Sequence, residues 1–228
     1  MKILAVDTAT PSCGVAIIDG ERVCASASIN PGHTHSRSVM PLLDMVLNVA
    51  GLCIDEIDVF AVTIGPGSFT GLRIGIACIK GLALALGKPV CGISALQALA
   101  APFSHAAVPV CPMIDARKNE VYYALYGNRS DRPVEILPPR VAPVDKVVSE
   151  IDGPALFVGT GALAAKDAIL KAKGRSALFV SSASAMINPA VVAELARDRI
   201  QEHGPDPVDT LCPLYIRPPD AIRMKEIP

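Results

Sequence analysis

A carboxylate and a hydroxyl follow the first apolar segment of the chain, in the sequence ILAVDTAT. Asp7 and Thr8 come at the end of a predicted buried strand and before a predicted hairpin. A turn in this position can offer backbone N–H groups to a phosphate while the carboxylate holds Mg²⁺ through water. The same residues can also simply cap a turn, and a motif this short has many chance matches. Pattern alone therefore makes Asp7 and Thr8 candidates for a nucleotide loop and leaves both interpretations open.

A second candidate loop, GPGSFTG at residues 65–71, lies between a predicted strand and a long apolar helix. It lacks the Walker pattern, because Leu72 and Arg73 stand where that motif needs Lys followed by Ser or Thr. It is not a nucleophile elbow either, because Ser68 lacks a glycine two residues away on each side. The loop therefore matches neither of these two motifs.

The apolar helix after this loop, predicted over 71–86, carries small residues on one stripe. Gly71 and Gly75 lie one turn apart, and Cys78 follows roughly one turn later. A stripe of small side chains lets another backbone approach closely. From the sequence, that backbone belongs either to the protein's own sheet or to a partner.

The second half of the chain contains two weaker candidates for phosphate contact. Asp115, in DARKNE, follows a predicted strand and forms either a second phosphate contact or a charged hairpin with an internal ion pair. Gly159 and Gly161, in VGTGA, follow another predicted strand and resemble half of a dinucleotide fingerprint. No acidic residue is placed to bind a ribose, so this signal is weak.

Metal and nucleophile chemistry have little support in the sequence. His33 and His35 precede the first predicted helix without an HExxH, HxxxH or cysteine partner, so we expect solvated side chains there. His105 and His203 stand alone, which gives no support to a Ser-His-Asp triad. The seven cysteines are odd in number and form no CxxC, as free thiols in a reducing compartment would. We therefore expect no metal site and no cofactor.

The composition describes an ordered globular protein. The 228 residues are 51% hydrophobic, and 21 Lys and Arg face 22 Asp and Glu, for a net charge of −1. No basic run is present, so the chain alone is a poor candidate for gripping nucleic acid. The first apolar run is too short for a signal peptide, and the longest, 72–86, is interrupted by charge and glycine. These features predict a cytoplasmic protein without a membrane span.

Apolar periodicity and turn residues divide the chain into two similar halves. We expect strands at 3–6, 13–18, 22–28, 59–64, 89–93, 108–114, 120–126 and 155–158. We expect helices at 36–50, 71–86, 94–101, 144–151, after Gly159–Gly161 and at 190–203, and an irregular Pro-rich strip at 132–143. Three strands followed by alternating helix and strand, in two halves, predict an α/β fold with mixed sheets. We expect lobes at 1–103 and 104–228, with the helix near 190–203 a candidate to pack back on the first lobe.

Five segments together resemble the bacterial TsaB (YeaZ) family. They are MKILAVDTAT, GPGSFTGLRIGIACIKGLALA, IDARKNEVYYALY, VGTGA and PLYIR, in the family's order and spacing, and they cover nearly the whole chain. The resemblance implies a two-lobed, actin-like fold of the ASKHA (ribonuclease H-like) group. It also implies a role in installing threonylcarbamoyl on N6 of adenosine 37 in ANN-decoding tRNAs. In this family catalysis belongs to the paralogous partner TsaD, and an ATPase, TsaE, joins the pair.

The resemblance further implies a scaffold that contacts tRNA only indirectly, through its complex. The helices at 38–50 and 71–86 would pair with their counterparts on TsaD, or with a second copy when the chain is alone. The residues expected at this contact are Leu42, Leu43, Val46, Leu47, Gly71, Leu72, Gly75, Ile76, Cys78 and Ile79. Asp7, Thr8, Asp115, Gly159 and Gly161 would be vestiges of nucleotide loops. The alternatives are an independent ASKHA-type phosphotransferase or ATPase and, with less support, a metalloprotease.

Overall fold

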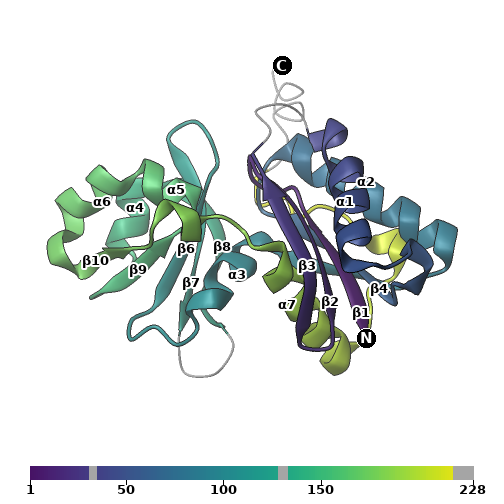
Figure 1. Cartoon of the computed structure of the whole chain (residues 1–228). Coiled ribbons are helices and arrows are strands. Elements are labelled where there is room, and N and C mark those ends of the chain that lie inside the picture. Colours follow the sequence, from purple (N-terminus) through teal and green to yellow (C-terminus); the bar gives the residue numbers. More distant parts are fainter. Residues whose placement is uncertain (31–34, 128–132, 218–228) are drawn as a thin grey trace, which may run out of the picture.

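The chain folds around two mixed five-stranded sheets (Figure 1). The computed structural model describes residues 1–30, 35–127 and 133–217. The first sheet has the order β3-β2-β1-β4-β5. Its strands are β1 (Lys2–Asp7), β2 (Cys13–Asp19), β3 (Arg22–Ile29), β4 (Val59–Gly65) and β5 (Val90–Ser94). β1, β4 and β5 are parallel, while β2 runs antiparallel to both β1 and β3, so the carboxyl ends of β1 and β4 lie together.

The second sheet repeats the connectivity of the first. Its order is β10-β9-β6-β7-β8, which matches the first sheet strand for strand when read from β8. The strands are β6 (Val110–Asp115), β7 (Glu120–Gly127), β8 (Val134–Pro143), β9 (Ala155–Val158) and β10 (Ala177–Phe179). The predicted repeat of one plan in two halves is therefore confirmed.

Two features of the second sheet differ from the sequence prediction. The strip at 132–143, expected to be irregular, contains the ten-residue strand β8. β8 lies at the edge of the sheet, where a proline has no ladder hydrogen bond to forfeit on its outer side. β10 was not predicted, because a strand of three residues leaves no alternation to detect.

Helices cover both faces of each sheet and fill the space between the two sheets. The α-helices are α1 (Val39–Ala50), α2 (Phe69–Leu86), α3 (Ala95–Ala100), α4 (Val144–Ser149), α5 (Thr160–Ala164), α6 (Lys166–Lys173) and α7 (Pro189–His203). Short 3-10 turns are η1 (His35–Arg37), η2 (Ile54–Glu56), η3 (Ala101–Phe103), η4 (Gly174–Ser176), η5 (Ser182–Ala185) and η6 (Val208–Thr210). α1 and α2 lie side by side on the outer face of the first sheet (Figure 1).

Three apolar clusters hold these layers together. One joins α1 and α2 to the first sheet, around Phe60 and Ile79. A second lies between the two sheets and includes α3, α7 and residues of both sheets. A third joins the second sheet to the helices on its far side, around Phe157 and Tyr123. The middle cluster buries α3 and α7 on both sides, so the two lobes share one core there.

α7 comes late in the sequence but packs on the first sheet. Its first residue, Pro189, lies against Gly14 of β2, where a Cβ would meet the proline ring at 3.0 Å. Near the end of α7, Arg199 donates to both carboxylate oxygens of Asp206, which lies beyond the helix, at 2.5 and 2.6 Å, and to Gly92 O at 2.9 Å. We propose residues 1–103 and 104–228 as the two lobes, with α7 completing the first.

α2 is the only helix of the described ranges with the length and composition of a membrane span. Its 18 residues have a mean hydropathy of 1.6, and 33% of them are buried inside the protein. Lys80, halfway along, donates from Nζ to Asp209 O and Leu211 O at 3.2 Å each. Lys80 therefore holds the segment Asp209–Leu211 against the side of α2. A helix surrounded by lipid could not have this segment at its side, so we assign α2 to the folded protein.

Candidate functional site

Asp7, at the carboxyl end of β1, is completely buried. Its Oδ1 accepts hydrogen bonds from Ala9 N at 3.1 Å and from Thr63 Oγ1 at 2.7 Å. Oδ2 has no hydrogen-bond partner among the described protein atoms. Burial, only partly offset by these two bonds, raises the pKa of Asp7 from 3.8 to about 6. Asp7 is therefore enclosed in the protein rather than presented to a ligand.

The loop after Asp7 lies directly against the glycine loop that begins α2. A Cβ on Gly67 would stand 2.2 Å from Ala9 O, and a Cβ on Gly71 would stand 2.2 Å from Thr8 O. No side chain fits at either position without moving backbone, which is the close approach that glycine allows. Ser68 N donates to Ala9 O at 2.8 Å and fixes the contact. In this structure the glycine loop holds the protein's own backbone.

Thr8 continues this contact into the first turns of α2. The Thr8 hydroxyl Oγ1 donates to Gly71 O at 2.8 Å. A Cβ on Gly75 would stand 2.3 Å from Thr8 Oγ1. His35 lies beside the loop, with Nε2 2.8 Å from Thr10 O. His35 is buried, so the expectation of a solvated side chain is wrong for it, and His33 lies outside the described residues.

The second lobe packs its own glycines in the same way. A Cβ on Gly159, whose φ is +97°, would stand 2.3 Å from Met113 O at the end of β6. A Cβ on Gly161 would stand 2.9 Å from Ile114 C and 3.0 Å from Asp115 N. Gly159 and Gly161 follow β9 as the glycine loop follows β4, so both lobes use glycine to seat a helix on the neighbouring strand end. The predicted vestigial loop residues Asp115, Gly159 and Gly161 are thereby brought together.

A hairpin follows Asp115, which is one of the two predicted alternatives, since β6 and β7 are antiparallel neighbours. Asp115 Oδ1 accepts from Arg117 N at 2.7 Å. Glu120 pairs instead with Arg217, which comes from the end of the chain. Within the ranges described, no group of three or more His, Cys, Asp and Glu side chains is placed to hold a metal ion.

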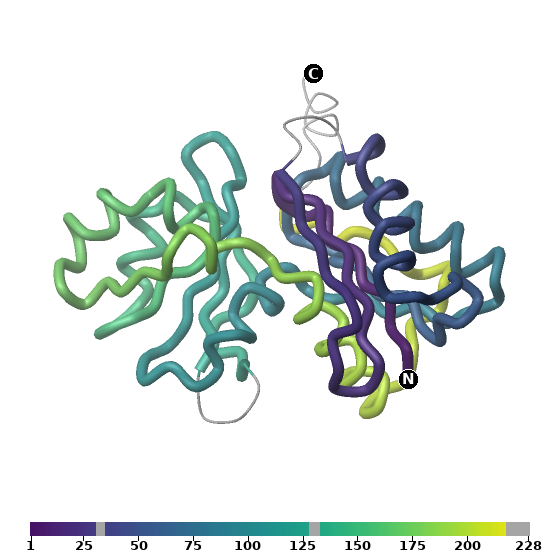
Figure 2. Tube along the Cα trace, viewed as in Figure 1, coloured from purple at the N-terminus to yellow at the C-terminus, as the bar shows by residue number. Residues whose placement is uncertain are grey.

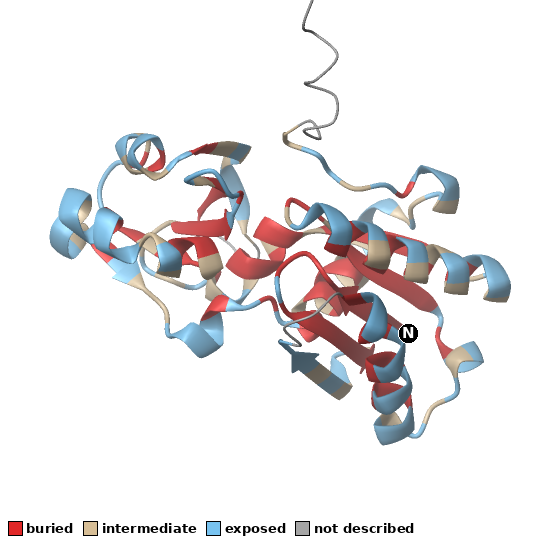
Figure 3. Cartoon of the chain, turned by 90° about the horizontal axis from the view of Figure 1, so that it is seen from above, coloured by how far each residue is buried: buried red, intermediate tan, exposed pale blue. Residues whose placement is uncertain are grey.

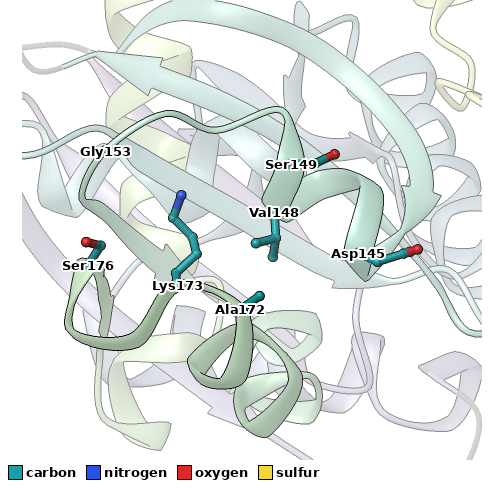
Figure 4. A pocket seen from close by; sticks show the side chains of 7 residues that line it. All are labelled: Asp145, Val148, Ser149, Gly153, Ala172, Lys173 and Ser176. Carbon is teal, nitrogen blue, oxygen red and sulfur yellow. The ribbon is translucent and has the colours of Figure 1, made fainter.

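One surface pocket, of about 420 Å³, is lined by none of these loop residues (Figure 4). It opens between α4 and α6 in the second lobe. Its lining residues are Asp145, Val148, Ser149, Gly153, Ala172, Lys173 and Ser176. Lys173 Nζ donates to Ile151 O at 2.5 Å, so this ammonium group already ties the helix to the loop behind it. The pocket has no contact with the candidate loops.

The predicted partner-contact residues lie on the inner face of α1 and α2, and this assignment is corrected. All except Cys78 are buried against the protein's own sheet: Leu42, Leu43, Val46, Leu47, Gly71, Leu72, Gly75, Ile76 and Ile79. The most apolar stripe of an amphipathic helix packs on its own core, and the sequence pattern identified that stripe. Cys78 is half-buried, and its Sγ lies 3.4 Å from Met40 Sδ, at the junction of the two helices.

The helices α1 and α2 each turn an exposed side to solvent (Figure 3), and large apolar side chains lie on this outer face. We use the name outer α1–α2 face for the exposed apolar residues Met40, Met45, Val49, Ala77, Gly81, Leu84 and Ala85; Pro41, Asp44 and Asn48 of α1 are exposed as well. The largest exposed fractions are 74% for Val49 and 64% for Leu84. Exposed Met and Leu side chains gathered on adjoining helices are typical of a surface that binds another protein.

Comparison with known proteins gives these features a family. A family model described as "TsaD: tRNA N6-adenosine threonylcarbamoyltransferase" matches residues 29–222. The tRNA threonylcarbamoyladenosine biosynthesis protein TsaB of Bacillus subtilis is 30% identical over 226 residues, covering 97% of this chain and 96% of the relative. The protein of the same name from Escherichia coli is 36% identical over 169 residues, covering 71% of this chain and 72% of the relative.

Solved structures agree with these sequence matches. YeaZ from Pseudomonas aeruginosa superposes with a TM-score of 0.80 at 27% identity, over 94% of this chain and 99% of that one. The activator of 2-hydroxyisocaproyl-CoA dehydratase from Clostridium difficile, solved with bound ADPNP, has a TM-score of 0.52 at 12% identity, over 89% of this chain and 96% of that one. The second likeness concerns the fold alone. With two mixed sheets flanked by helices, the predicted actin-like ASKHA fold is confirmed.

Proposed function

Because this chain belongs to the TsaB (YeaZ) family, we propose that it acts in tRNA threonylcarbamoyladenosine biosynthesis as a non-catalytic scaffold subunit. Its partner would be a TsaD-type paralogue that carries out threonylcarbamoyl transfer to N6 of adenosine 37 in ANN-decoding tRNAs. A TsaE-type ATPase would join the pair, and the chain would form a homodimer when alone. The assembly would work in the cytoplasm.

The observation that carries this proposal is the outer α1–α2 face. It presents apolar side chains from two adjoining helices, and Arg73 and Lys80 are the only charged residues along α2. Lys80 is already bound to backbone carbonyls. A face with few charges is what the buried core of a protein–protein interface requires, since charged residues are depleted there. A paralogue with the same two helices would bring a similar face.

The non-catalytic part of the proposal is supported by the enclosure of Asp7. A carboxylate that holds Mg²⁺ beside a nucleotide needs access to the ion, whereas Asp7 is completely buried. The Ala9 carbonyl accepts a hydrogen bond from Ser68 N, and the Thr8 carbonyl lies against Gly71 of α2. The first loop therefore contributes to the packing of α2 on the first sheet.

Reconstitution of the modification tests this function. The chain, its own TsaD-type paralogue, the TsaE-type ATPase and a donor-generating system would be mixed with unmodified tRNA, and threonylcarbamoyladenosine would be measured by mass spectrometry of nucleosides. We expect product only when the chain is present, and no ATP turnover by the chain alone. Full modification without the chain, or ATP turnover by the pure chain that Asp7→Ala abolishes, would contradict the proposal.

A further inference from the structure

Two exposed residues of opposite charge lie beside the outer α1–α2 face. Asp44 is the only charged residue of α1, and Arg73 and Lys80 are the charged residues of α2. Lys80 Nζ is already bound to the carbonyls of Asp209 and Leu211. Neither Asp44 nor Arg73 forms an ion pair with another residue that the structure describes. An anion on one helix and a cation on the other are therefore left for a partner.

Arg73 is held in place with part of its guanidinium group unused. The group lies over the Phe69 ring at 3.7 Å, and Nε donates to the Tyr215 hydroxyl at 2.9 Å. Nη1 and Nη2 donate to no other group of the described chain. Two such N–H donors match the two oxygens of a carboxylate. Because the side chain is already ordered, binding a carboxylate there costs little conformational entropy.

α1 and α2 lie side by side (Figure 2) and run in the same direction. β3, β4 and β5 are parallel, and each helix leads from the end of one of these strands to the start of the next. The contact between Met40 Sδ and Cys78 Sγ, at 3.4 Å, sets the height of one helix against the other. At a rise of about 1.5 Å per residue, Asp44 lies about 6 Å beyond this contact and Arg73 about 7.5 Å before it. The two charges are displaced by nearly equal distances in opposite directions.

Equal and opposite displacements are what a two-fold axis requires. An axis perpendicular to the face, at the height of Met40 and Cys78, reverses the direction of the helices in a second copy. It brings Arg73 of the second copy to within about 2 Å of the height of Asp44, and it forms the reciprocal pair at the same time. Ala77, next to Cys78, is exposed and small, so helices of two copies can approach closely at the axis. The face is thus complementary in charge to itself.

We propose that a second copy of this chain docks on the outer α1–α2 face, with Asp44 of each copy paired to Arg73 of the other. This pairing rests on the proposed function, which includes a homodimer of the free chain. Apolar side chains of both helices supply the buried area, and the two ion pairs fix the arrangement, since interfacial charges give specificity more than affinity. The paralogue would use the same face, so the dimer covers this surface until the paralogue replaces the second copy.

Two charge-reversal variants test the pairing by sedimentation equilibrium. A dimer of Asp44→Arg sets two cations against each other at both pairs, and a dimer of Arg73→Glu sets two anions against each other. An equimolar mixture of the two variants restores both ion pairs in a mixed dimer. Asp167→Arg and Arg175→Glu make the same changes at exposed positions of the second lobe, and their mixture controls for attraction by net charge. Circular dichroism checks that all four variants are folded.

We expect the wild type and both control variants to dimerise with equal affinity. Asp44→Arg and Arg73→Glu should each dimerise at least about tenfold more weakly, because two like-charged contacts replace two ion pairs. Their mixture should dimerise about as tightly as the wild type. The mixture of the control variants should dimerise no more tightly than either control variant alone.

Three results would overturn the pairing: a monomeric wild type, single variants that dimerise as tightly as the wild type, or a mixture as weak as the single variants. Calorimetry with the TsaD-type paralogue separates this failure from failure of the scaffold role. If the chain binds the paralogue but the mixture stays weak, the scaffold role stands and the pairing fails. If the mixture dimerises but the chain does not bind the paralogue, the pairing stands and the scaffold role fails.

Discussion

Replacing Gly71 by alanine tests whether the glycine loop exists to seat the protein's own backbone. A Cβ at this position would lie 2.2 Å from Thr8 O, whereas ordinary contacts begin near 3.4 Å. The loop after β1 must therefore retreat by at least about 1 Å. That loop is held by the Thr8 Oγ1 bond to Gly71 O, so the retreat also loosens a buried hydrogen bond.

The expected cost follows from three contributions. Overpacking of a tight contact costs about 1–3 kcal/mol. Weakening the buried hydrogen bond costs about 1 kcal/mol more. Alanine is a better helix former than glycine by about 1 kcal/mol, which offsets part of the loss. Gly71→Ala should therefore lower the free energy of unfolding by about 1–3 kcal/mol, which for a chain of this size lowers the melting temperature by about 3–10 °C.

Gly81 on the same helix provides a matched control. A Cβ there meets nothing within 4 Å, so Gly81→Ala should stabilise the protein by up to about 1 kcal/mol. Urea unfolding followed by circular dichroism should separate the two variants by about 2–4 kcal/mol. Equal stability of Gly71→Ala and Gly81→Ala would refute the packing interpretation, and the loop would then be free for another role.

Three further outcomes follow from the contacts of individual residues. Burial raises the pKa of Asp7 to about 6, so the folded protein holds this proton more tightly than the unfolded chain does. The free energy of unfolding of the wild type should therefore fall by about 3 kcal/mol as pH rises from about 4 to about 6. Asp7→Asn should remove most of that fall, measured by urea unfolding at pH 4 and pH 7. Gly75→Arg should give insoluble or unfolded protein in an expression and dichroism assay, because its side chain would start 2.3 Å from Thr8 Oγ1; a soluble, folded variant would contradict this. Asp206→Ala should destabilise the chain by about 1–3 kcal/mol in thermal unfolding, because it leaves the Arg199 guanidinium without its carboxylate; an unchanged melting temperature would show that this clamp contributes nothing.

The sequence predicts most elements because their patterns are local. Buried strands such as Val59–Gly65 read as continuous apolar runs, and α1 ends where Gly51 takes a φ of +67°. Strand β8 was missed because proline signals a loop in sequence, and its tolerance here depends on an edge position that only the sheet reveals. The solvated interpretation of His35 failed for the same reason, since its burial depends on the distant Thr10.

The candidate site was harder to predict, because it depends on which way each helix face points. Periodicity finds the apolar stripe of α1 and α2 but cannot show that this stripe meets the sheet. The exposed residues Val49 and Leu84 interrupt the pattern and were passed over, although an apolar residue on the wet side of a helix was a usable signal.

The affinity of this chain for its own TsaD-type paralogue, measured by calorimetry with variants of the outer α1–α2 face, tests the central claim most directly. Leu84→Asp places a charge where the partner would pack, and Ile136→Asp places the same charge at another exposed apolar position, on β8. The account predicts that the wild type and Ile136→Asp bind equally, and that Leu84→Asp, folded by circular dichroism, loses roughly a hundredfold in affinity, since an unpaired buried charge costs about 3–5 kcal/mol. Tight binding by Leu84→Asp together with loss of binding by Ile136→Asp would contradict it.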